Sequence, residues 1–498
     1  MGSVKKLAGQ TMWYGLSSIA ARFINYLLTP YLTYSSHIGV SDYGKLGIIY
    51  AAIPILNILF TYGFETAYFR FSAKPENKNS IYSTSALSII FSSIIFSCLL
   101  WTVHPSLGKV IGLADIPYLI QISILIVAID AFCAIPFARL RQENRPRKYA
   151  FLKIGGILVN IFFTWFFIGY CPGQKANSWV SGFYNPAINV VVYILMANLL
   201  QNIFTFLLLA SEFKSIRFKF NTRLWKQMVL YSLPLILVGM GGMVNETFDR
   251  LMLRWWLPGS PDFRDSQVGI YNACYKLSIL ITLFIQAFKM GAEPFFFKQA
   301  EGANPQRTYA RVMKFFVIII SVMFLVVVLF LPLWQLIIGP KYRVGLGVVP
   351  ILLLANMFLG IYYNLSIWFK LSNKTMAGAY ITLAGSAITF LINFTLIPHF
   401  GYMACAWATF FCYGSMMVFS FVLGQKAYRV PYAWKKLVAF MAIAVMLFFI
   451  HKGLTSLTGN LVFNVATGLV LISAYCLFIL KVEKQEFQKL PVIGKFLK

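Results

Sequence analysis

The sequence predicts an all-α integral membrane protein that crosses the bilayer about 14 times. Apolar residue types make up 59% of the 498 residues and charged types only 12%, and the mean hydropathy is +0.72. A soluble domain has roughly 25% charged residues, so this chain has too few charges to cover a water-facing surface. Apolar runs of about 20 residues, long enough to cross ~30 Å of hydrocarbon, recur along nearly the whole length. The strands of a membrane β-barrel would instead alternate over about 10 residues.

Fourteen spans are predicted, and the loops between them are short. They cover residues 12–34, 46–69, 81–103, 117–138, 149–170, 187–210, 227–253, 268–288, 315–337, 344–369, 376–397, 402–424, 435–451 and 459–480. The first run is longer than the apolar core of a signal peptide, so we expect it to be an uncleaved helix. No soluble domain or large external loop is expected.

The basic residues predict the orientation of the chain. If both termini are cytoplasmic, the cytoplasmic segments hold 31 of the 43 Lys and Arg residues and the external segments hold 8. Cytoplasmic loops of membrane proteins are enriched in these residues, and this explains the net charge of +28 without a nucleic-acid partner. The seven cysteines form no CxxC pair and six lie in apolar runs, so neither a metal site nor a disulfide framework is expected.

Weak internal repeats predict two related halves. Gly44 opens the second span and Gly269 opens the eighth, 225 residues later, while Asn160 and Asn393 recur at a spacing of 233. A repeat of six spans keeps the same orientation, so the halves would be related by an axis along the membrane normal. The predicted domains are 1–215 (spans one to six), 216–425 (spans seven to twelve) and 426–498 (two additional spans and a cytoplasmic tail).

A few charged residues lie inside the predicted spans. A charge at the bilayer centre costs about 2.5–3.5 kcal/mol even on the lenient insertion scale, so these side chains are expected to face a cavity or one another. The predicted substrate-binding cations are Arg22, Lys153, Arg250 and Lys276, and the acids predicted to couple ions or to form ion pairs in the cavity are Glu65, Asp130, Glu246 and Asp249.

Simpler roles for these charges stay open. Glu246 and Arg250 have the favourable i,i+4 order and could neutralise each other, Lys153 could extend toward the interface, and the acids could either couple to ions or only balance cations.

Span seven also contains residues that favour a bend. Pro234 is followed by three glycines, Gly239, Gly241 and Gly242, and these four residues are predicted to form a gate or hinge. The alternative is a static kink, because proline bends many membrane helices without moving.

Several short motifs resemble a known family. They are Thr29-Pro30-Tyr31-Leu32-Thr33, Asp42-Tyr43-Gly44, Gly63-Phe64-Glu65-Thr66-Ala67, Ser232-Leu233-Pro234, Asp249-Arg250, Val268-Gly269-Ile270-Tyr271 and Tyr275-Lys276-Leu277. In these motifs and in topology, the chain resembles the polysaccharide transport branch of the MATE-like (MOP) superfamily, the oligosaccharide flippases of O-antigen type.

This resemblance implies a fold and a function. The fold would be two six-helix lobes in a V around a central cationic cavity, plus two C-terminal helices. The function would be alternating-access movement of an undecaprenyl-pyrophosphate-linked oligosaccharide to the outer leaflet of the bacterial inner membrane, for lipopolysaccharide or other surface polysaccharide. The cations would bind the phosphates, and arginine can do so bidentately.

The expected partners are the lipid-linked oligosaccharide, membrane lipid, and the polymerase and glycosyltransferase machinery. A monomer is expected, with no cofactor and with a proton or sodium gradient as the energy source.

Three other functions are weighed against this one. A lipid II flippase of peptidoglycan synthesis would have a similar cationic cavity. A multidrug exporter of the same superfamily expels mainly cations, which fits a cationic cavity poorly. A membrane polysaccharide polymerase or ligase would usually carry its catalytic residues on a large external loop, which this chain lacks. The sequence therefore favours a transporter and not an enzyme.

Overall fold

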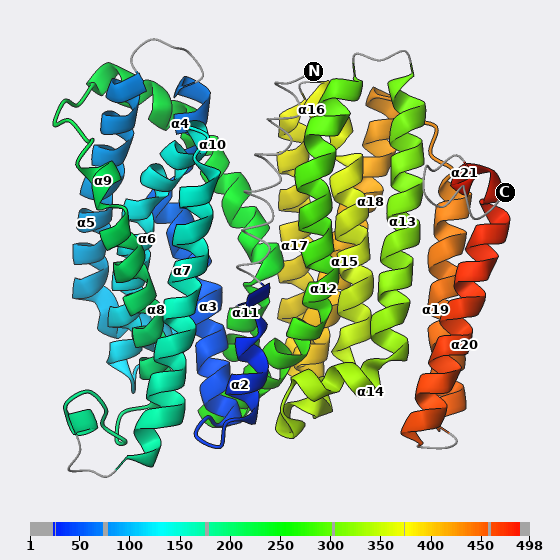
Figure 1. Ribbon diagram of the computed structural model, residues 1–498, viewed down its shortest axis with the longest axis horizontal. Coiled ribbons are helices and arrows are strands. Elements are labelled where there is room, and N and C mark those ends of the chain that lie inside the picture. Colours follow the sequence, from blue (N-terminus) through cyan, green and yellow to red (C-terminus); the bar gives the residue numbers. More distant parts are fainter. Residues whose placement is uncertain are drawn as a thin grey trace. The chain divides into compact units, whose positions relative to one another are not determined.

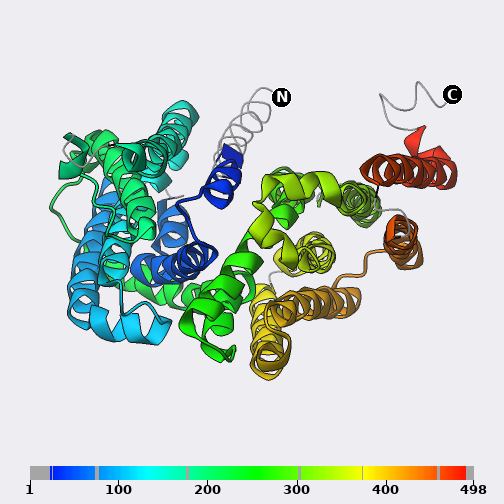
Figure 2. The same cartoon turned by 90° about the horizontal axis from the view of Figure 1, so that it is seen from below.

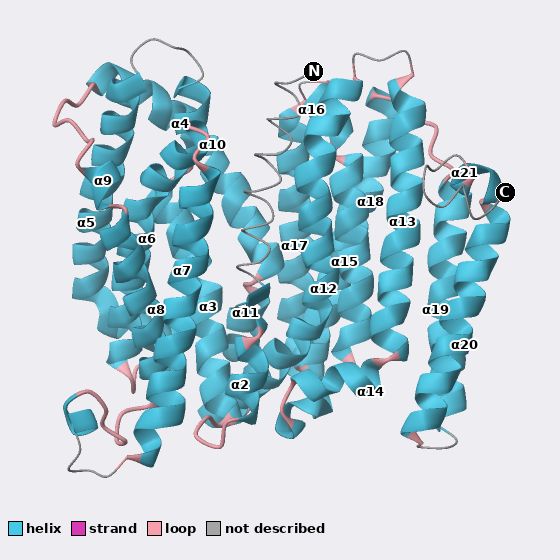
Figure 3. Cartoon of the chain, viewed as in Figure 1, coloured by secondary structure: helices cyan, strands magenta, loops and turns pink. Residues whose placement is uncertain are grey.

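The computed structural model describes residues 23–24, 26–72, 78–174, 179–300, 304–372, 374–456 and 460–488. Within these residues every regular element is helical (Figure 3). The α-helices are α2 (Leu28–Tyr34), α3 (Val40–Thr61), α4 (Phe64–Ser72), α5 (Lys78–Ile111), α6 (Pro117–Gln142), α7 (Pro146–Trp165), α8 (Val190–Leu208), α9 (Ala210–Phe213), α10 (Thr222–Glu246), α11 (Asp249–Trp256), α12 (Pro261–Gln299), α13 (Pro305–Leu329), α14 (Leu331–Trp334), α15 (Val348–Leu365), α16 (Ile367–Leu371), α17 (Thr375–Phe400), α18 (Tyr402–Ala427), α19 (Trp434–Ser456), α20 (Leu461–Val482) and α21 (Lys484–Phe487). Short helical turns η1–η5 connect some of them.

The predicted spans have counterparts in these helices. Thirteen helices of the described chain are long and apolar enough to cross a membrane, and they correspond one for one to the second through fourteenth predicted spans. Most of the first predicted span, 12–34, lies outside the described residues, and α2 covers its end. The predicted fold class, an all-α protein with many membrane spans, is confirmed.

Several predicted spans are divided before their predicted ends. In the ninth, predicted over 315–337, α13 ends at Leu329 and the short elements α14 and η4 follow. The second span, predicted over 46–69, is divided between α3 and α4, where Tyr62 and Gly63 have φ of 34° and 72°. The seventh, predicted over 227–253, is divided between α10 and α11 at Thr247 and Phe248. Hydropathy measures composition alone, so it does not register a change of backbone direction within an apolar stretch.

The described chain forms two compact units, which are treated separately. The first contains the described residues within Met1–Lys276 together with Thr382–Cys412, and the second contains Leu277–Ile381 with the described part of Tyr413–Lys498. The domain boundaries predicted at residues 215 and 425 stay a prediction, because these units reflect packing and not sequence repetition.

In the first unit, α6 is the central helix of the N-terminal half. It packs against α3, α5 and α8, and α7 in turn packs against α8 (Figure 1). One core cluster joins Phe64 and Tyr68 of α4 to Tyr82 of α5, Ile135 of α6 and Met228 of α10. Helix α10 therefore belongs to the same packed body as α3–α6.

Two glycines of the predicted repeats meet in this unit. A Cβ atom built on Gly44 of α3 would overlap the carbonyl oxygen of Asp265 in α12, and one built on Gly269 would overlap that of Val40 in α3. Each Cβ would lie 3.1 Å from the backbone nitrogen of the other glycine. The contact is reciprocal, and two helices can approach this closely only where both lack side chains.

In the second unit, α13 packs against α15, α19 and α20, and α19 and α20 lie beside each other (Figure 2). Glu483, just beyond the end of α20, accepts hydrogen bonds from Lys314 Nζ of α13 at 2.6 Å and Lys436 Nζ of α19 at 3.1 Å. Burial by itself would raise the pKa of Glu483, but the two lysines outweigh it and hold the pKa below its ordinary value. This carboxylate ties the two C-terminal helices to α13.

Candidate transport site

The break between α10 and α11 exposes backbone groups inside the first unit. Thr247 caps the end of α10, where its N–H still bonds Met243 O and its hydroxyl donates to the same carbonyl at 3.2 Å. The carbonyl of Glu246, the last residue of α10, accepts a 3.0 Å hydrogen bond from Nη1 of the Arg250 guanidinium. Since broken helices place polar backbone within the membrane only where partners satisfy it, Arg250 is part of the structure of the break.

Arg250 and Asp249 form a buried ion pair at the start of α11. Their side chains are 7% and 4% exposed, and Nη1 of Arg250 lies 2.9 Å from Oδ1 of Asp249. The Tyr271 hydroxyl of α12 donates to Oδ2 of the same carboxylate at 2.6 Å. The guanidinium lies over the Tyr275 ring, 4.4 Å from its centroid, and 5.6 Å from that of Tyr271. Two tyrosines one helical turn apart on α12 thus hold the pair.

Two more predicted residues adjoin this cluster. Lys276 follows Tyr275 and is half-buried, and within the described chain its ammonium has no hydrogen bond or ion pair. It lies close enough to Arg250 for the two positive charges to repel. The Glu246 side chain is exposed, so Arg250 pairs with Asp249 and takes only the backbone oxygen of Glu246. An uncompensated ammonium within a predicted span is available to an anionic ligand.

Asp130 and Lys153 lie at a second polar site in the first unit. They line a cavity of about 40 Å³ together with Gln201 and Asn202 of α8. Asp130 attracts the Lys153 ammonium, which also lies 4.2 Å from the centroid of the Phe137 ring. Since about 10–15 Å³ is needed for one water, the cavity has room for a few waters and not for a sugar. The site can hold a proton or a small ion.

Glu65 forms an ion pair with Arg141 of α6, whose guanidinium also lies over the Phe69 ring. Arg22 lies outside the described residues, so its predicted role stays a prediction.

The predicted hinge residues differ in their surroundings. Pro234 lies inside α10, which is continuous through it. A Cβ on Gly239 would contact Ile58 at 3.4 Å, and one on Gly241 would contact Leu383 and Ser386 at 3.3 Å. A Cβ on Gly242 would have no neighbour within 4 Å. Gly241 therefore serves close packing in this structure, whereas an added Cβ at Gly239 would make only an ordinary contact, and a hinge function stays a prediction.

Sequence reasoning missed two buried charge clusters in the first unit. Arg254 of α11 pairs with Asp265 of α12 at 2.5 Å and donates to Gly112 O at 3.0 Å. The sequence alone offers no signal for this pair, because Arg254 and Asp265 lie in the predicted external segment between the seventh and eighth spans.

The second missed cluster surrounds Glu212, whose carboxylate is 2.8 Å from both Arg145 Nη1 and Lys148 Nζ. Burial alone would raise the pKa of Glu212, but Lys148, Arg145 and Arg139 hold it below its ordinary value. The density of cations between the fourth and fifth spans was a signal that a carboxylate is needed there.

Comparison with known proteins decides the family. The family model described as polysaccharide biosynthesis protein matches residues 7–300, more than half of the chain. The chain belongs to this polysaccharide biosynthesis family. A search of the curated proteins found no match.

Solved structures of the MOP superfamily are similar to this member of the polysaccharide biosynthesis family. One is described as the lipid II flippase MurJ in an inward closed conformation, with a TM-score of 0.65 and 13% identity, over 94% of this chain and 98% of that one. Another is a multidrug resistance MATE family transporter in an inward-facing conformation, with a TM-score of 0.60 and 14% identity, over 84% of this chain and 93% of that one. The fold is therefore that of MATE and MurJ.

Proposed function

We propose that the protein is a flippase that moves an undecaprenyl-pyrophosphate-linked oligosaccharide from the cytoplasmic to the outer leaflet by alternating access. The product would be exported as surface polysaccharide, such as O-antigen. Membership of the polysaccharide biosynthesis family supports a polysaccharide cargo, and the similarity of the fold to those of MurJ and MATE supports a transporter. The choice of cargo rests on one observation, which is that the Lys276 ammonium has no counter-ion in the described chain. Such an ammonium favours an anionic headgroup.

The proposed binding step uses Lys276 and Arg250. Lys276 attracts the pyrophosphate as a point charge, while Arg250 is already shared between Asp249 and a backbone oxygen. Because guanidinium has five N–H donors, Arg250 can bind phosphate without leaving Asp249. Arg22 completes the set of cations in this proposal. Lys153 was also predicted to bind the cargo, but it lines the small Asp130 cavity, so we assign it instead to ion coupling. Binding of the sugars and of the prenyl chain requires no charged side chain of the protein.

Energy would come from a proton or sodium gradient. The small Asp130–Lys153 cavity supports this, since it is polar and too small for the cargo. Asp249, Glu246 and Glu65 are further candidates for coupling. Collapse of both gradients in sealed vesicles should stop transport, and transport that continues at the same rate would refute the coupling proposal. We further propose a monomer in the bacterial inner membrane with both termini in the cytoplasm, consistent with the distribution of Lys and Arg.

Deletion and complementation test the function. Deletion of the gene should remove the surface glycan, and the wild-type gene should restore it. Lys276→Ala should reach the membrane in normal amount but restore little or no glycan. Lys109→Ala is the matched control, because Lys109 is exposed at the end of α5 and forms no hydrogen bond or ion pair with the residues of the cluster. Normal surface glycan in the Lys276→Ala strain would refute the proposed binding role.

A lipid II flippase is the second candidate, and the similarity to the MurJ fold favours it. The two cargoes predict different phenotypes. Loss of a lipid II flippase would stop peptidoglycan synthesis and cause lysis, whereas loss of an oligosaccharide flippase would leave growing cells that lack the glycan. Lysis on depletion, with lipid II retained in the cytoplasmic leaflet, would replace the oligosaccharide proposal. A multidrug exporter would instead alter drug sensitivity and leave glycan unchanged.

A further inference from the structure

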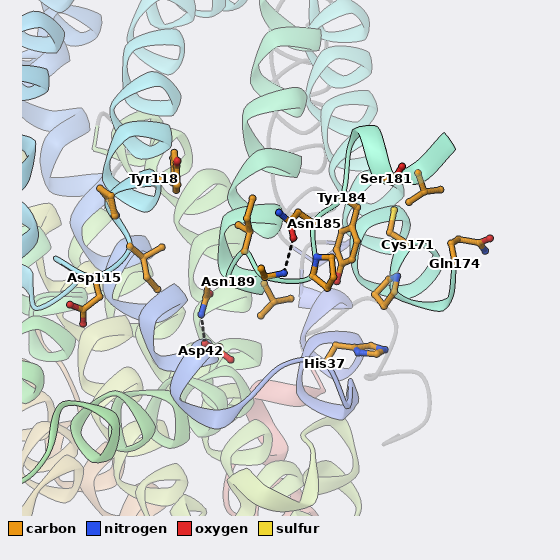
Figure 4. Close-up of a pocket in the computed structure, with 18 residues that line it drawn as sticks. His37, Asp42, Asp115, Tyr118, Cys171, Gln174, Ser181, Tyr184, Asn185 and Asn189 are labelled. Atoms are coloured by element: carbon orange, nitrogen blue, oxygen red, sulfur yellow. Dashed lines mark hydrogen bonds between the residues drawn. The ribbon is translucent and has the colours of Figure 1, made fainter. Parts of the chain in front are cut away.

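A large pocket lies in the first unit, at the end where the chain enters α3, α6 and α8 (Figure 4). Its volume is about 1000 Å³, at the upper end of the ~300–1,000 Å³ range of ligand pockets. The walls come from the segments before α3 and α6 and from the segment between α7 and α8. The Lys and Arg distribution predicts that all three segments are external. The pocket is separate from the Asp249–Arg250 pair and from the Asp130–Lys153 cavity, since it shares no lining residue with either.

One wall of the pocket is held by internal hydrogen bonds. The side-chain amide of Asn189 donates to Oδ1 of Asp42 at 2.9 Å, and its oxygen accepts from the Val191 N–H at 2.9 Å (Figure 4). The Tyr193 hydroxyl donates to the Asn185 carbonyl at 3.0 Å and accepts from the Asn185 N–H at 2.7 Å. These bonds hold the wall in one arrangement before any ligand binds, which lowers the entropy that binding must oppose.

The opposite wall carries groups that are free to bind. Asp115 and Tyr118 are exposed, and within the described chain neither side chain makes a hydrogen bond or ion pair. Gln174 and Tyr184 also line the pocket, and Figure 4 shows them on the side away from Asp115. Two carboxylates, amides and phenols thus surround one space, and none of the described residues that line it is Lys or Arg.

This chemistry fits a carbohydrate. A sugar hydroxyl is both a donor and an acceptor, so it can donate to a carboxylate while it accepts from an amide N–H. Tyrosine rings provide apolar faces for the C–H faces of a pyranose, and their hydroxyls provide polar edges. The Asp42 carboxylate is balanced by the Lys45 ammonium, which lies 3.4 Å from its Oδ1, but the Asp115 carboxylate has no counter-ion in the described chain. One uncompensated carboxylate, with no Lys or Arg among the described lining residues, favours the sugar over the pyrophosphate.

We infer that this pocket binds the carbohydrate part of the exported glycan on the external side, with Asp115 and Tyr118 as direct contacts. The inference rests on the proposed function and adds a second site to it. A sugar that has crossed would bind there, while the headgroup cations lie elsewhere in the same unit. The pocket thus gives the carbohydrate a binding site of its own, separate from the site of the headgroup.

Photo-crosslinking in cells that make the glycan tests this site on the full-length protein. The photoreactive residue p-benzoylphenylalanine replaces Tyr118 in one variant and Phe183 in a control variant. Phe183 is 67% exposed on the α7–α8 segment and does not line the pocket. We expect a covalent glycan adduct at position 118, identified by mass spectrometry, and none at position 183.

A second substitution in the position-118 background tests the contact. Asp115→Asn should reduce the adduct by about fivefold, the effect of one hydrogen bond of about 1 kcal/mol. Asp262→Asn is the matched control, since Asp262 is an exposed aspartate in the first turn of α12, does not line the pocket and should change nothing. The inference would be overturned by adducts that contain only phospholipid or peptide, or by equal adducts at positions 118 and 183. An adduct that a calcium chelator abolishes would also overturn it.

The two proposals fail in different ways. If the wild-type gene restores surface glycan to the deletion strain but position 118 gives no glycan adduct, the flippase stands and the external sugar site falls. If deletion leaves the surface glycan intact, the proposed function itself falls.

Discussion

The crossing of α3 and α12 allows a sharp test of the packing. Gly44→Ala and Gly269→Ala each add one methyl group, and each methyl would overlap a backbone carbonyl oxygen of the other helix. A backbone atom cannot rotate away as a side chain can, so the helices themselves must separate. Overpacking typically costs about 1–3 kcal/mol, and we expect the upper end of that range. The overlap is deeper at Gly44, so Gly44→Ala should be the more harmful change.

Gly242→Ala is the matched control for this pair. It makes the same change inside a membrane helix, but its Cβ meets no atom within 4 Å. Alanine favours a helix over glycine by about 0.8–1.0 kcal/mol, so this variant should be as stable as the wild type or slightly more so. The two classes of variant should therefore differ by about 2–4 kcal/mol.

The assay is thermal unfolding of the purified protein in one detergent, followed by size-exclusion chromatography with fluorescence detection. Unfolding of such a protein is commonly irreversible, so apparent Tm values are compared at one scan rate. Gly44→Ala and Gly269→Ala should each lower the apparent Tm by several degrees relative to Gly242→Ala. Equal Tm values for all three variants would refute the close backbone contact. Loss of surface glycan in Gly242→Ala at normal stability would support the predicted hinge.

Further predictions concern the buried carboxylates and Arg250. Glu212→Gln should cost about 1.5–3 kcal/mol at neutral pH, measured as a lower Tm, because charge-assisted hydrogen bonds from Lys148 and Arg145 are weakened. The folded pKa of Glu212 lies below the ordinary value, so its stabilisation is present above that value and is lost as pH falls through the folded pKa. The wild type should lose Tm toward acid more steeply than Glu212→Gln, and parallel curves would contradict this. Glu483→Gln should make α19 and α20 more sensitive to limited proteolysis at neutral pH, while unchanged cleavage would contradict their attachment through this carboxylate. Arg250→Ala leaves the buried Asp249 without its cation and should cost about 3–5 kcal/mol. Addition of Asp249→Asn should recover Tm but not surface glycan, and recovery of both would exclude a role for Arg250 in binding.

The spans were predictable from the sequence because a helix that crosses a membrane must satisfy its own backbone hydrogen bonds and must carry a long run of apolar side chains. That requirement is local, so hydropathy finds nearly every helix. It places the ends less well: α13 begins at Pro305 and not at 315, and α12 ends at Gln299 and not at 288. The break at Thr247 was not predictable in this way, because α10 and α11 are joined by residues whose composition suits a continuous span. The arrangement of the backbone there depends on contacts with α3, such as the 3.4 Å hydrogen bond from the Thr247 hydroxyl to Ala51 O.

The charged residues of the site were predictable, but their partners were not. Asp249 and Arg250 are conspicuous in an apolar run, whereas the hydrogen bond from Tyr271 to Asp249 joins residues 22 positions apart on two helices. The helical rule favoured Glu246 as the partner of Arg250, but the end of α10 at Glu246 removes the regular i,i+4 geometry. Pairs such as Glu65–Arg141 require tertiary packing that no local pattern encodes.

The reciprocal contact between Gly44 and Gly269 restricts how this protein can change. In most packed interfaces a larger side chain on one helix can be accommodated by a smaller one on its neighbour. Here both positions already carry the smallest residue, so neither can compensate for the other. A mutation at either position can be tolerated only if the angle or spacing of the helices changes. The crossing therefore fixes a distance between α3 and α12 that compensatory side-chain substitution cannot adjust.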